Sequence, residues 1–282
     1  MKKYLKTVLK TEPLPIDILT GLLWNLNPSG IEEEDGKIIV YFENDDENHV
    51  KEVHEILNQI KESGIIERFN IDTEICEYKN WNEEWERSLN IIKVTENITI
   101  KPTFRDYTPA PGELVILIDP KMSFGTGEHQ TTKLIIKLLE RYVQKGIDVL
   151  DAGTGTGILA ITAVKLGASH ALGFDNDELC LINGEENVEI NSLSSQIEIR
   201  LAEINQIEVK EFDLVIANIQ KNVLLNIASE IHMRTKKNGV VILSGLLLDD
   251  EIDINNKYES IGFQFVEKLV MDEWISLVYR KL

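Results

Sequence analysis

The sequence contains few cysteines and prolines and no long apolar run. Only Cys76 and Cys180 are present among 282 residues, and they are isolated, so neither a disulfide framework nor a CxxC site is expected. Seven prolines and 43% hydrophobic residues argue against extensive disorder. No apolar stretch approaches the roughly 18 residues of a membrane helix, and the charged first ten residues lack the apolar region of a signal peptide. We therefore expect a cytoplasmic protein that does not associate with membranes.

Basic residues are also scarce. The chain has 29 Lys and Arg against 48 Asp and Glu, which gives a formal net charge of −19. Residues 1–90 alone hold 20 acidic against 10 basic residues, a balance of −10. Free nucleic acid is therefore not an expected partner, because phosphate binding needs clustered Lys and Arg, whereas a basic protein would be attracted. The five histidines show no metal-ligand spacing, and no metal is predicted.

A glycine-rich segment is the most informative feature that the sequence does contain. The run Asp151-Ala-Gly-Thr-Gly-Thr-Gly157 follows an apolar stretch and leads into the apolar residues 158–166, as a loop between a strand and a helix does. Its glycines are Gly153, Gly155 and Gly157. Glycines let a backbone curl tightly against a ligand, and the following helix offers free amide donors. The dinucleotide fingerprint would need a third glycine at position 158, which is Ile, so hydride chemistry is not favoured.

A carboxylate follows the glycine loop at a meaningful distance. The apolar run 171–174 ends on Asp175, 22 positions after Gly153, where a second strand can present an acid to ribose hydroxyls. Loop and acid together resemble motif I and the following acid of a class I S-adenosylmethionine methyltransferase. The alternative is a βαβ unit whose glycines only tighten a turn, and it would leave Asp175 and the third glycine as coincidences.

The first 78 residues are predicted to form a small α+β domain. The expected elements are a strand at 4–10, a helix after Pro15, a strand at 38–42, a helix capped by Asn48 and ending at Gly64, and an extended segment at 65–78. This order resembles a ferredoxin-like domain. Residues 79–90 are charged and place Trp81 and Trp85 on one helical face, which predicts a linker helix.

Residues 91–282 are predicted to form a larger α/β domain. Two strand-like runs at 97–103 and 114–118 would begin it. Strands and helices then alternate at 147–151, 158–166, 171–175, 178–190, 197–202, 213–217, 223–233 and 240–244. Such alternation predicts a parallel doubly wound sheet that binds ligands at the carboxyl ends of its strands. A final hairpin, 263–270 and 274–279, would add an antiparallel edge strand.

Two further motifs belong to this domain. Residues 123–132 form a second glycine loop before an amphipathic helix; the alternative interpretation is a plain turn with Thr131 or Thr132 as helix N-cap. The apolar strand that starts at Asp213 ends on Asn218, whose amide could hydrogen-bond beside a transferred methyl group. An Asn that caps a turn is the commoner meaning of that position.

In order and spacing these elements resemble the PrmA family, the methyltransferases of ribosomal protein L11. The residues that carry the resemblance are Trp81-x-x-x-Trp85, Asp119-Pro120, Phe124-Gly-Thr-Gly-x-His129, Thr131-Thr132, the glycine loop with Ile158-Leu-Ala-Ile161, Lys165-Leu-Gly-Ala168, Ala217-Asn-Ile219, Leu243-Ser-Gly245 and Glu273-Trp274. The resemblance covers the larger domain through its motifs and the first 78 residues only through their architecture.

The resemblance implies an enzyme that uses S-adenosylmethionine to methylate amines of ribosomal protein L11, on lysine side chains and, as a further candidate, on the N-terminal amine. It implies substrate recognition by residues 1–78. Position by position, it implies cofactor contact through Thr132, Gly153, Asp175 and Asn218. Together with Gly155 and Gly157 of the first loop and Phe124 and Gly125 of the second, these are the predicted cofactor-binding residues. Asn218 is expected to orient the acceptor, and no general base is nominated.

The chain departs from the family pattern on the expected acceptor side. Glu128 and Gln130 stand where the family commonly has Thr and Pro, and residues 220–223 replace a small turn that contains proline. One alternative function is methylation of glutamine or nucleic-acid amines, but those enzymes carry Asn/Asp-Pro-Pro-Tyr where this chain has Asn218-Ile-Gln-Lys. Another is a methyltransferase-like module that binds the cofactor without turnover. The acidic runs 32–35 and 43–47 are either part of a recognition surface or solvated loops.

Overall fold

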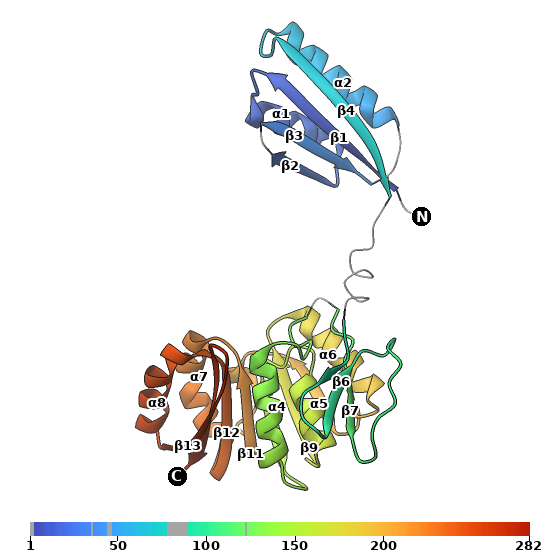
Figure 1. Cartoon of the computed structure of the whole chain (residues 1–282). Helices are drawn as coiled ribbons and strands as arrows, with labels where there is room; N and C mark the ends of the chain where they lie inside the picture. The colour runs from blue at the N-terminus through green and yellow to red at the C-terminus, as the bar shows by residue number, and fades with distance from the viewer. Residues whose placement is uncertain (1–2, 35, 44–46, 78–88, 122) are drawn as a thin grey trace. The chain divides into compact units, whose positions relative to one another are not determined.

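The computed structural model describes residues 3–34, 36–43, 47–77, 89–121 and 123–282. The chain divides into two compact units, Met1–Glu84 and Trp85–Leu282 (Figure 1). Most of the predicted linker helix at 79–90, including both tryptophans, lies outside the described residues. None of the helices in the described ranges has the length and apolar character needed to cross a membrane.

The first unit has the predicted ferredoxin-like fold. Its elements are β1 (Lys3–Glu12), α1 (Ile16–Leu23), β2 (Gly30–Glu34), β3 (Lys37–Phe42), α2 (Glu47–Glu62) and β4 (Arg68–Glu77). The strands form an antiparallel sheet in the order β2-β3-β1-β4. Alternate residues of β1, Leu5 and Leu9, point into a core that includes Leu19 of α1 and Leu57 of α2.

One local prediction in this unit was wrong, and one of two open interpretations is excluded. Helix α2 begins at Glu47, so Asn48 lies inside the helix and is not its N-cap. Residues 32–34 of the first acidic run form strand β2 and not a loop, because Ile31 packs against the core and pairs with Val40 of β3. Their side chains are nevertheless exposed, as the charge pattern predicted.

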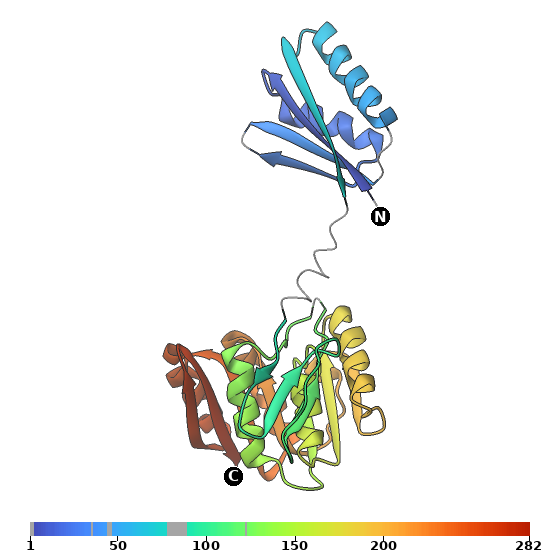
Figure 2. The same ribbon diagram turned by 45° about the vertical axis from the view of Figure 1, so that its right-hand side comes forward.

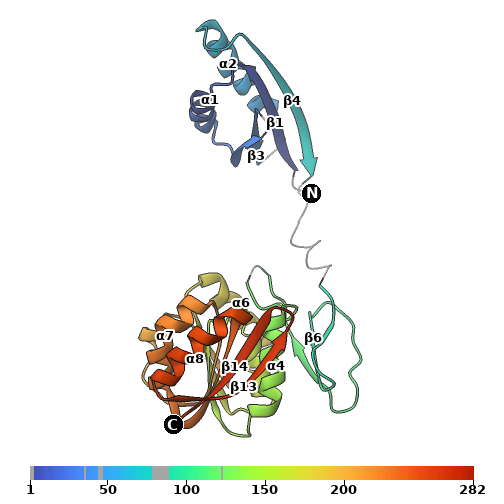
Figure 3. The same ribbon diagram turned by 60° about the vertical axis from the view of Figure 1, so that its left-hand side comes forward.

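The second unit contains the predicted doubly wound sheet. Its main elements are β8 (Asp148–Ala152), α5 (Ile158–Lys165), β9 (His170–Asp175), α6 (Glu178–Ile190), β10 (Ile197–Leu201), β11 (Phe212–Asn218), α7 (Lys221–Arg234), β12 (Thr235–Leu247), α8 (Glu251–Ser260), β13 (Phe263–Met271) and β14 (Trp274–Lys281). The strand order is β10-β9-β8-β11-β12-β14-β13. The antiparallel strand of the predicted hairpin, β14, lies one place in from the edge, between β12 and β13 (Figure 3).

A short segment precedes this sheet. Strands β5 (Ile92–Lys93), β6 (Ile98–Lys101) and β7 (Leu114–Leu117) form a small separate sheet before helix α4 (Gln130–Tyr142). Two asparagines, Asn187 of α6 and Asn191 directly after this helix, hold the end of β7 and the chain that follows it. Asn191 hydrogen-bonds both backbone groups of Leu117, and the side-chain carbonyl of Asn187 accepts from the backbone nitrogen of Asp119 at 2.9 Å. This attachment fixes the entry to the second glycine loop.

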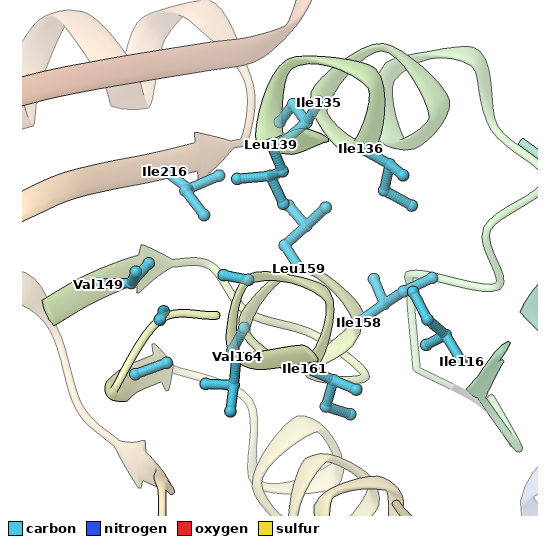
Figure 4. Packing of buried hydrophobic residues seen from close by; sticks show 14 of the residues in the cluster. Ile116, Ile135, Ile136, Leu139, Val149, Ile158, Leu159, Ile161, Val164 and Ile216 are labelled. Carbon is cyan, nitrogen blue, oxygen red and sulfur yellow. The ribbon is translucent and has the colours of Figure 1, made fainter. Parts of the chain in front are cut away.

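Helices cover both faces of the large sheet (Figure 1 and Figure 2). One core contains apolar residues of α4, α5 and α6, and the other contains those of α7 and α8. Figure 4 shows Leu139 of α4, Leu159 of α5 and Ile216 of β11 meeting in the first core. Every residue of α5 from Ile158 to Val164 is buried. Since each large apolar side chain contributes about 1.5–3 kcal/mol on burial, α5 is firmly held, and so is the loop that enters it.

Candidate cofactor and acceptor site

The first glycine loop joins β8 to α5 in a conformation that only glycine adopts easily. Gly153, Gly155 and Gly157 have φ angles of 72°, 53° and 79°, all in the left-handed region. A Cβ atom at position 155 would lie 2.3 Å from the carbonyl oxygen of Phe124, and one at position 153 would lie 2.4 Å from Cγ2 of Ile219. The glycines are therefore needed because two other segments approach the loop closely.

Asp175 lies against this loop. Its Oδ2 atom accepts a hydrogen bond from the backbone nitrogen of Gly155 at 3.0 Å, and its Oδ1 atom accepts from the backbone nitrogen of Asp177 at 3.2 Å. The carboxylate reaches the loop because β8 and β9 are neighbouring parallel strands whose carboxyl ends share one edge of the sheet. The structure thus brings together the two features that the sequence had linked only by spacing.

The second glycine loop docks on the first. The backbone nitrogen of Thr156 donates to the carbonyl oxygen of Phe124 at 3.0 Å, and the Thr156 hydroxyl donates to the carbonyl oxygen of Gly125 at 2.8 Å. The loop then enters α4, whose N-cap is His129: its Nδ1 atom accepts from the backbone nitrogen of Thr131. The alternative that Thr131 or Thr132 caps this helix is therefore wrong, and both residues lie in its first turn.

Asn218 ends β11 beside the same turn of α4. Its Nδ2 atom donates to the hydroxyl of Thr132 at 3.4 Å, and Thr132 is almost fully buried. Ile219, the next residue, is the one whose side chain approaches Gly153. Gly245, after β12 residue Ser244, also has a positive φ of 80°, and a Cβ there would lie 2.6 Å from the carbonyl oxygen of Ile219. The carboxyl ends of β8, β9 and β11 therefore bring together the first glycine loop, Asp175 and Asn218, and the second loop and α4 add Phe124, Gly125 and Thr132.

Asp151 is a site residue to which the sequence had assigned no role. It is fully buried at the loop end of β8, and its Oδ2 atom accepts from the Thr154 hydroxyl at 2.7 Å and from the backbone nitrogen of Ala160 at 3.2 Å. Its Oδ1 atom has no hydrogen-bond partner among the described residues. Burial raises the pKa of Asp151 to about 7, and nearby Asp175 adds to this, while the two hydrogen bonds oppose it. The sequence signal that could have indicated this buried acid is its position directly after the apolar residues Val149 and Leu150.

A hollow opens on the second glycine loop. It is lined by residues 123–126 and 128–130. The rings of Phe124 and His129 lie 5.8 Å apart, and the indole of Trp274 meets the His129 ring edge-on with centroids 4.7 Å apart. The Gln130 amide donates to Asp272 at 3.1 Å, which ties the loop to the turn between β13 and β14.

A second cavity lies at the opposite edge of the sheet. It is lined mostly by residues at the amino ends of β8 to β11, among them Asp148, His170 and Lys210, and also by Arg200 of β10. No predicted site residue lines it. Throughout the ranges that the structure describes, no three His, Cys, Asp or Glu side chains gather as a metal ion would require.

The large sheet is doubly wound, and β14 is inserted antiparallel beside β12. A glycine loop follows β8, and an acid, Asp175, ends β9 and contacts that loop. These features define a class I S-adenosylmethionine-dependent methyltransferase. Sequence comparison agrees. Residues 23–282 match the family described as ribosomal protein L11 methyltransferase (PrmA). The chain belongs to this family, which confirms the resemblance seen in its motifs.

Individual relatives support the assignment. The ribosomal protein L11 methyltransferase of Desulforapulum autotrophicum is 38% identical over 209 residues, which cover 74% of this chain and 69% of that protein. That of Ruminiclostridium cellulolyticum is 34% identical over 256 residues, 88% of this chain and 79% of that protein. A crystal structure of ribosomal protein L11 methylase from Lactobacillus delbrueckii subsp. bulgaricus is 32% identical with a TM-score of 0.64, and the match covers 68% of this chain and 99% of that one.

Proposed function

We propose that this protein transfers methyl groups from S-adenosylmethionine to amines of ribosomal protein L11, on lysine side chains and, as a further candidate, on its N-terminal amine. One observation carries the proposal. The Asp175 carboxylate accepts a hydrogen bond from the backbone nitrogen of Gly155 in the first glycine loop, at 3.0 Å. The strand before this loop, β8, pairs with β11, which ends on Asn218. Family membership supports the choice of substrate, because the relatives are described as methyltransferases of that protein.

The residues at the site suit the cofactor. The left-handed φ angles of Gly153, Gly155 and Gly157 curl the loop tightly, as a loop that binds the methionine and ribose parts of the cofactor requires, and Asp175 would accept hydrogen bonds from ribose hydroxyls. Phe124, Gly125 and Thr132 would contact it from the second loop. When bound, the cofactor supplies a methyl group activated by its sulfonium charge.

The acceptor must be a neutral amine held in line with that methyl group, at about 3–3.5 Å. A lysine with a pKa of about 10.4 loses its proton at pH 7 at a cost of roughly 4.6 kcal/mol, while positioning can supply roughly 7–11 kcal/mol. A dedicated base is therefore not required. The Asn218 amide and nearby carbonyls orient the nitrogen, and water takes the proton.

The charge of the protein fits a basic partner. Ribosomal proteins are generally basic, and a chain with a net charge of −19 would attract one and repel free nucleic acid. We assign recognition of this substrate to residues 1–78 and the chemistry to residues 91–282. We place the reaction in the cytoplasm, where ribosomal proteins are made and assembled.

An assay with isotope-labelled S-adenosylmethionine tests the proposal. The purified protein is incubated separately with ribosomal protein L11, with ribosomal RNA and with a glutamine-rich peptide that lacks lysine and has a blocked amino terminus. We expect label only in ribosomal protein L11. Label in RNA or in the glutamine peptide would favour the first alternative function. Cofactor binding without any transfer would favour a binding module.

A further inference from the structure

We infer that the hollow on the second glycine loop binds the alkylammonium group of the substrate lysine, with Glu128 as its counter-ion. The inference rests on the proposed function and adds a capture site to it. It assigns a role in acceptor recognition to the exposed carboxylate of Glu128, which has no part in the proposed cofactor contacts, and a second role to the exposed ring of Phe124 beside its proposed contact with the cofactor.

The wall of the hollow is aromatic. Phe124 is 60% exposed, although it sits on a loop whose backbone is pinned to Thr156. The His129 ring lies 5.8 Å from it, and Trp274 packs against the far edge of that histidine. Aromatic faces attract alkylammonium ions through their quadrupole and offer the methylene groups of lysine an apolar surface.

The charge of the hollow favours a cation. Glu128 is exposed, and its carboxylate has no hydrogen-bond or ion-pair partner among the described residues. Its backbone nitrogen donates to the Thr126 hydroxyl at 3.2 Å, which fixes the turn that presents it. No Lys or Arg lines the hollow. The unpaired carboxylate of Glu128 is therefore the only acidic or basic side chain in the described lining apart from the imidazole of His129, whose Nδ1 atom accepts a hydrogen bond from the backbone nitrogen of Thr131.

The hollow lies next to the expected point of methyl transfer. His129 caps the first turn of α4, and the same turn holds Thr132, which hydrogen-bonds Asn218 at 3.4 Å. The Gln130 to Asp272 hydrogen bond and the contact between His129 and Trp274 keep this wall in place. The hollow and Asn218 are therefore both attached to the first turn of α4.

Capture and transfer make opposite demands on the amine. A carboxylate favours the protonated ammonium, whereas transfer needs the neutral amine. Glu128 therefore acts in collecting the substrate, and the nitrogen leaves it when the proton passes to water. Removing the charge should weaken substrate binding without slowing the transfer step.

Steady-state kinetics with ribosomal protein L11 test this role. Glu128→Gln should raise KM for the substrate about two- to fivefold, as expected for an exposed ion pair, and leave kcat and the S-adenosylmethionine Kd unchanged. Glu128→Asp should restore part of the affinity. The matched control is Glu189→Gln, an exposed acid on α6, which should leave KM unchanged.

Glu128 also precedes the amino end of α4, where a carboxylate stabilises a helix. An E128Q variant with lowered stability and an unchanged KM would show only that structural role and overturn the inference.

A binding measurement separates the hollow from the proposed function. Backbone amide NMR signals of residues 123–130 are followed while butylammonium is added, with butanol as the neutral control. We expect shifts with butylammonium that are weaker in E128Q and absent with butanol. If butylammonium shifts these signals but the protein does not methylate ribosomal protein L11, the hollow binds alkylammonium groups and the proposed substrate is wrong. Equal responses to both probes, or none to either, would contradict the inference whatever the protein methylates.

Discussion

Two carboxylates on neighbouring strands occupy opposite environments. Asp151 ends the apolar part of β8 and is fully buried, whereas Asp175 ends β9 and is partly exposed. Asp175 accepts hydrogen bonds from two backbone nitrogens and faces the side on which a ligand would bind. Asp151 instead supports the loop from inside through Thr154 and Ala160. Asp175 is therefore suited to ligand binding, and Asp151 is suited to stabilising the conformation of the loop.

Replacement of Asp175 by Ala should weaken cofactor binding. Loss of hydrogen bonds to a charged group costs roughly 1.5–3 kcal/mol, which corresponds to about a 10- to 150-fold increase in Kd. Calorimetric titration with S-adenosylmethionine measures this directly, with Glu189→Ala as an exposed control. An unchanged Kd in the Asp175 variant would refute the ribose assignment.

Asp151 should make stability depend on pH. Its folded-state pKa of about 7 lies above its usual value of 3.8, so between these pH values the folded protein holds a proton that the unfolded chain releases. The free energy of unfolding should therefore fall as pH rises through this window, by up to roughly 4 kcal/mol, and level off above about pH 7. Asp151→Asn should flatten the dependence. Guanidinium titrations of both proteins from pH 5 to 8 provide the comparison, and parallel curves would contradict the buried-acid account.

At the scale of elements, the site depends on two loops that touch. The carbonyl oxygen of Phe124 accepts from Thr156 and lies where a Cβ of residue 155 would fall. Gly155 is therefore required by its neighbour as well as by its own backbone. A change in the first loop therefore moves the second loop. The hollow lies on this second loop, and Thr132 lies in the helix that follows it.

Gly155→Ala should reduce cofactor affinity at least about tenfold, because the new methyl group displaces the second loop. Gly146→Ala is the matched control: its φ is also positive, at 86°, but nothing lies within 4 Å of the added atom. The control should lose about 1–2 kcal/mol of stability from backbone strain and keep its affinity. Equal affinities in the two variants would show that the contact between the loops is not needed for binding.

The sequence predicted most elements of the second unit because buried strands and amphipathic helices alternate there with glycine turns. Helix α8 was missed since only Ile254 and Tyr258 of its ten residues are buried, which gives a weak apolar period. The cap of α4 was missed because His129 is an uncommon N-cap residue. Strand β2 was missed since its charged residues follow a single apolar anchor, Ile31.

At the scale of the whole molecule, cofactor motifs and acidic surface belong to different units. Every predicted site residue lies between residues 124 and 218, within the second unit, Trp85–Leu282. The edge strand β2 of the first unit exposes three consecutive acids, residues 32–34. The spacing of glycines and acids could predict that the first glycine loop and Asp175 lie together, because a loop after one strand and the end of the next parallel strand share one end of the sheet. The hollow could not be predicted from the sequence, because its shape depends on how the backbone of residues 123–130 folds and on contacts of this segment with Trp274 and Asp272, which are distant in the sequence.

A fragment that starts at residue 79 should separate the two roles. We expect it to bind S-adenosylmethionine almost as tightly as the whole chain and to fail to methylate ribosomal protein L11, because it lacks residues 1–78, to which we assign substrate recognition. Circular dichroism first establishes that the fragment is folded, and calorimetry and the labelled-methyl assay follow. Methylation by the folded fragment at the full-length rate would contradict the division of labour.

Intact-mass and peptide mass spectrometry of ribosomal protein L11 most directly tests the central claim. The substrate is incubated with the full-length protein and S-adenosylmethionine, with and without the Asp175→Ala substitution. We expect added methyl groups on lysine or N-terminal amines with the unsubstituted protein, and far fewer with the variant at limiting cofactor. An unchanged mass of ribosomal protein L11, in the presence of a protein that demonstrably binds the cofactor, would contradict the account.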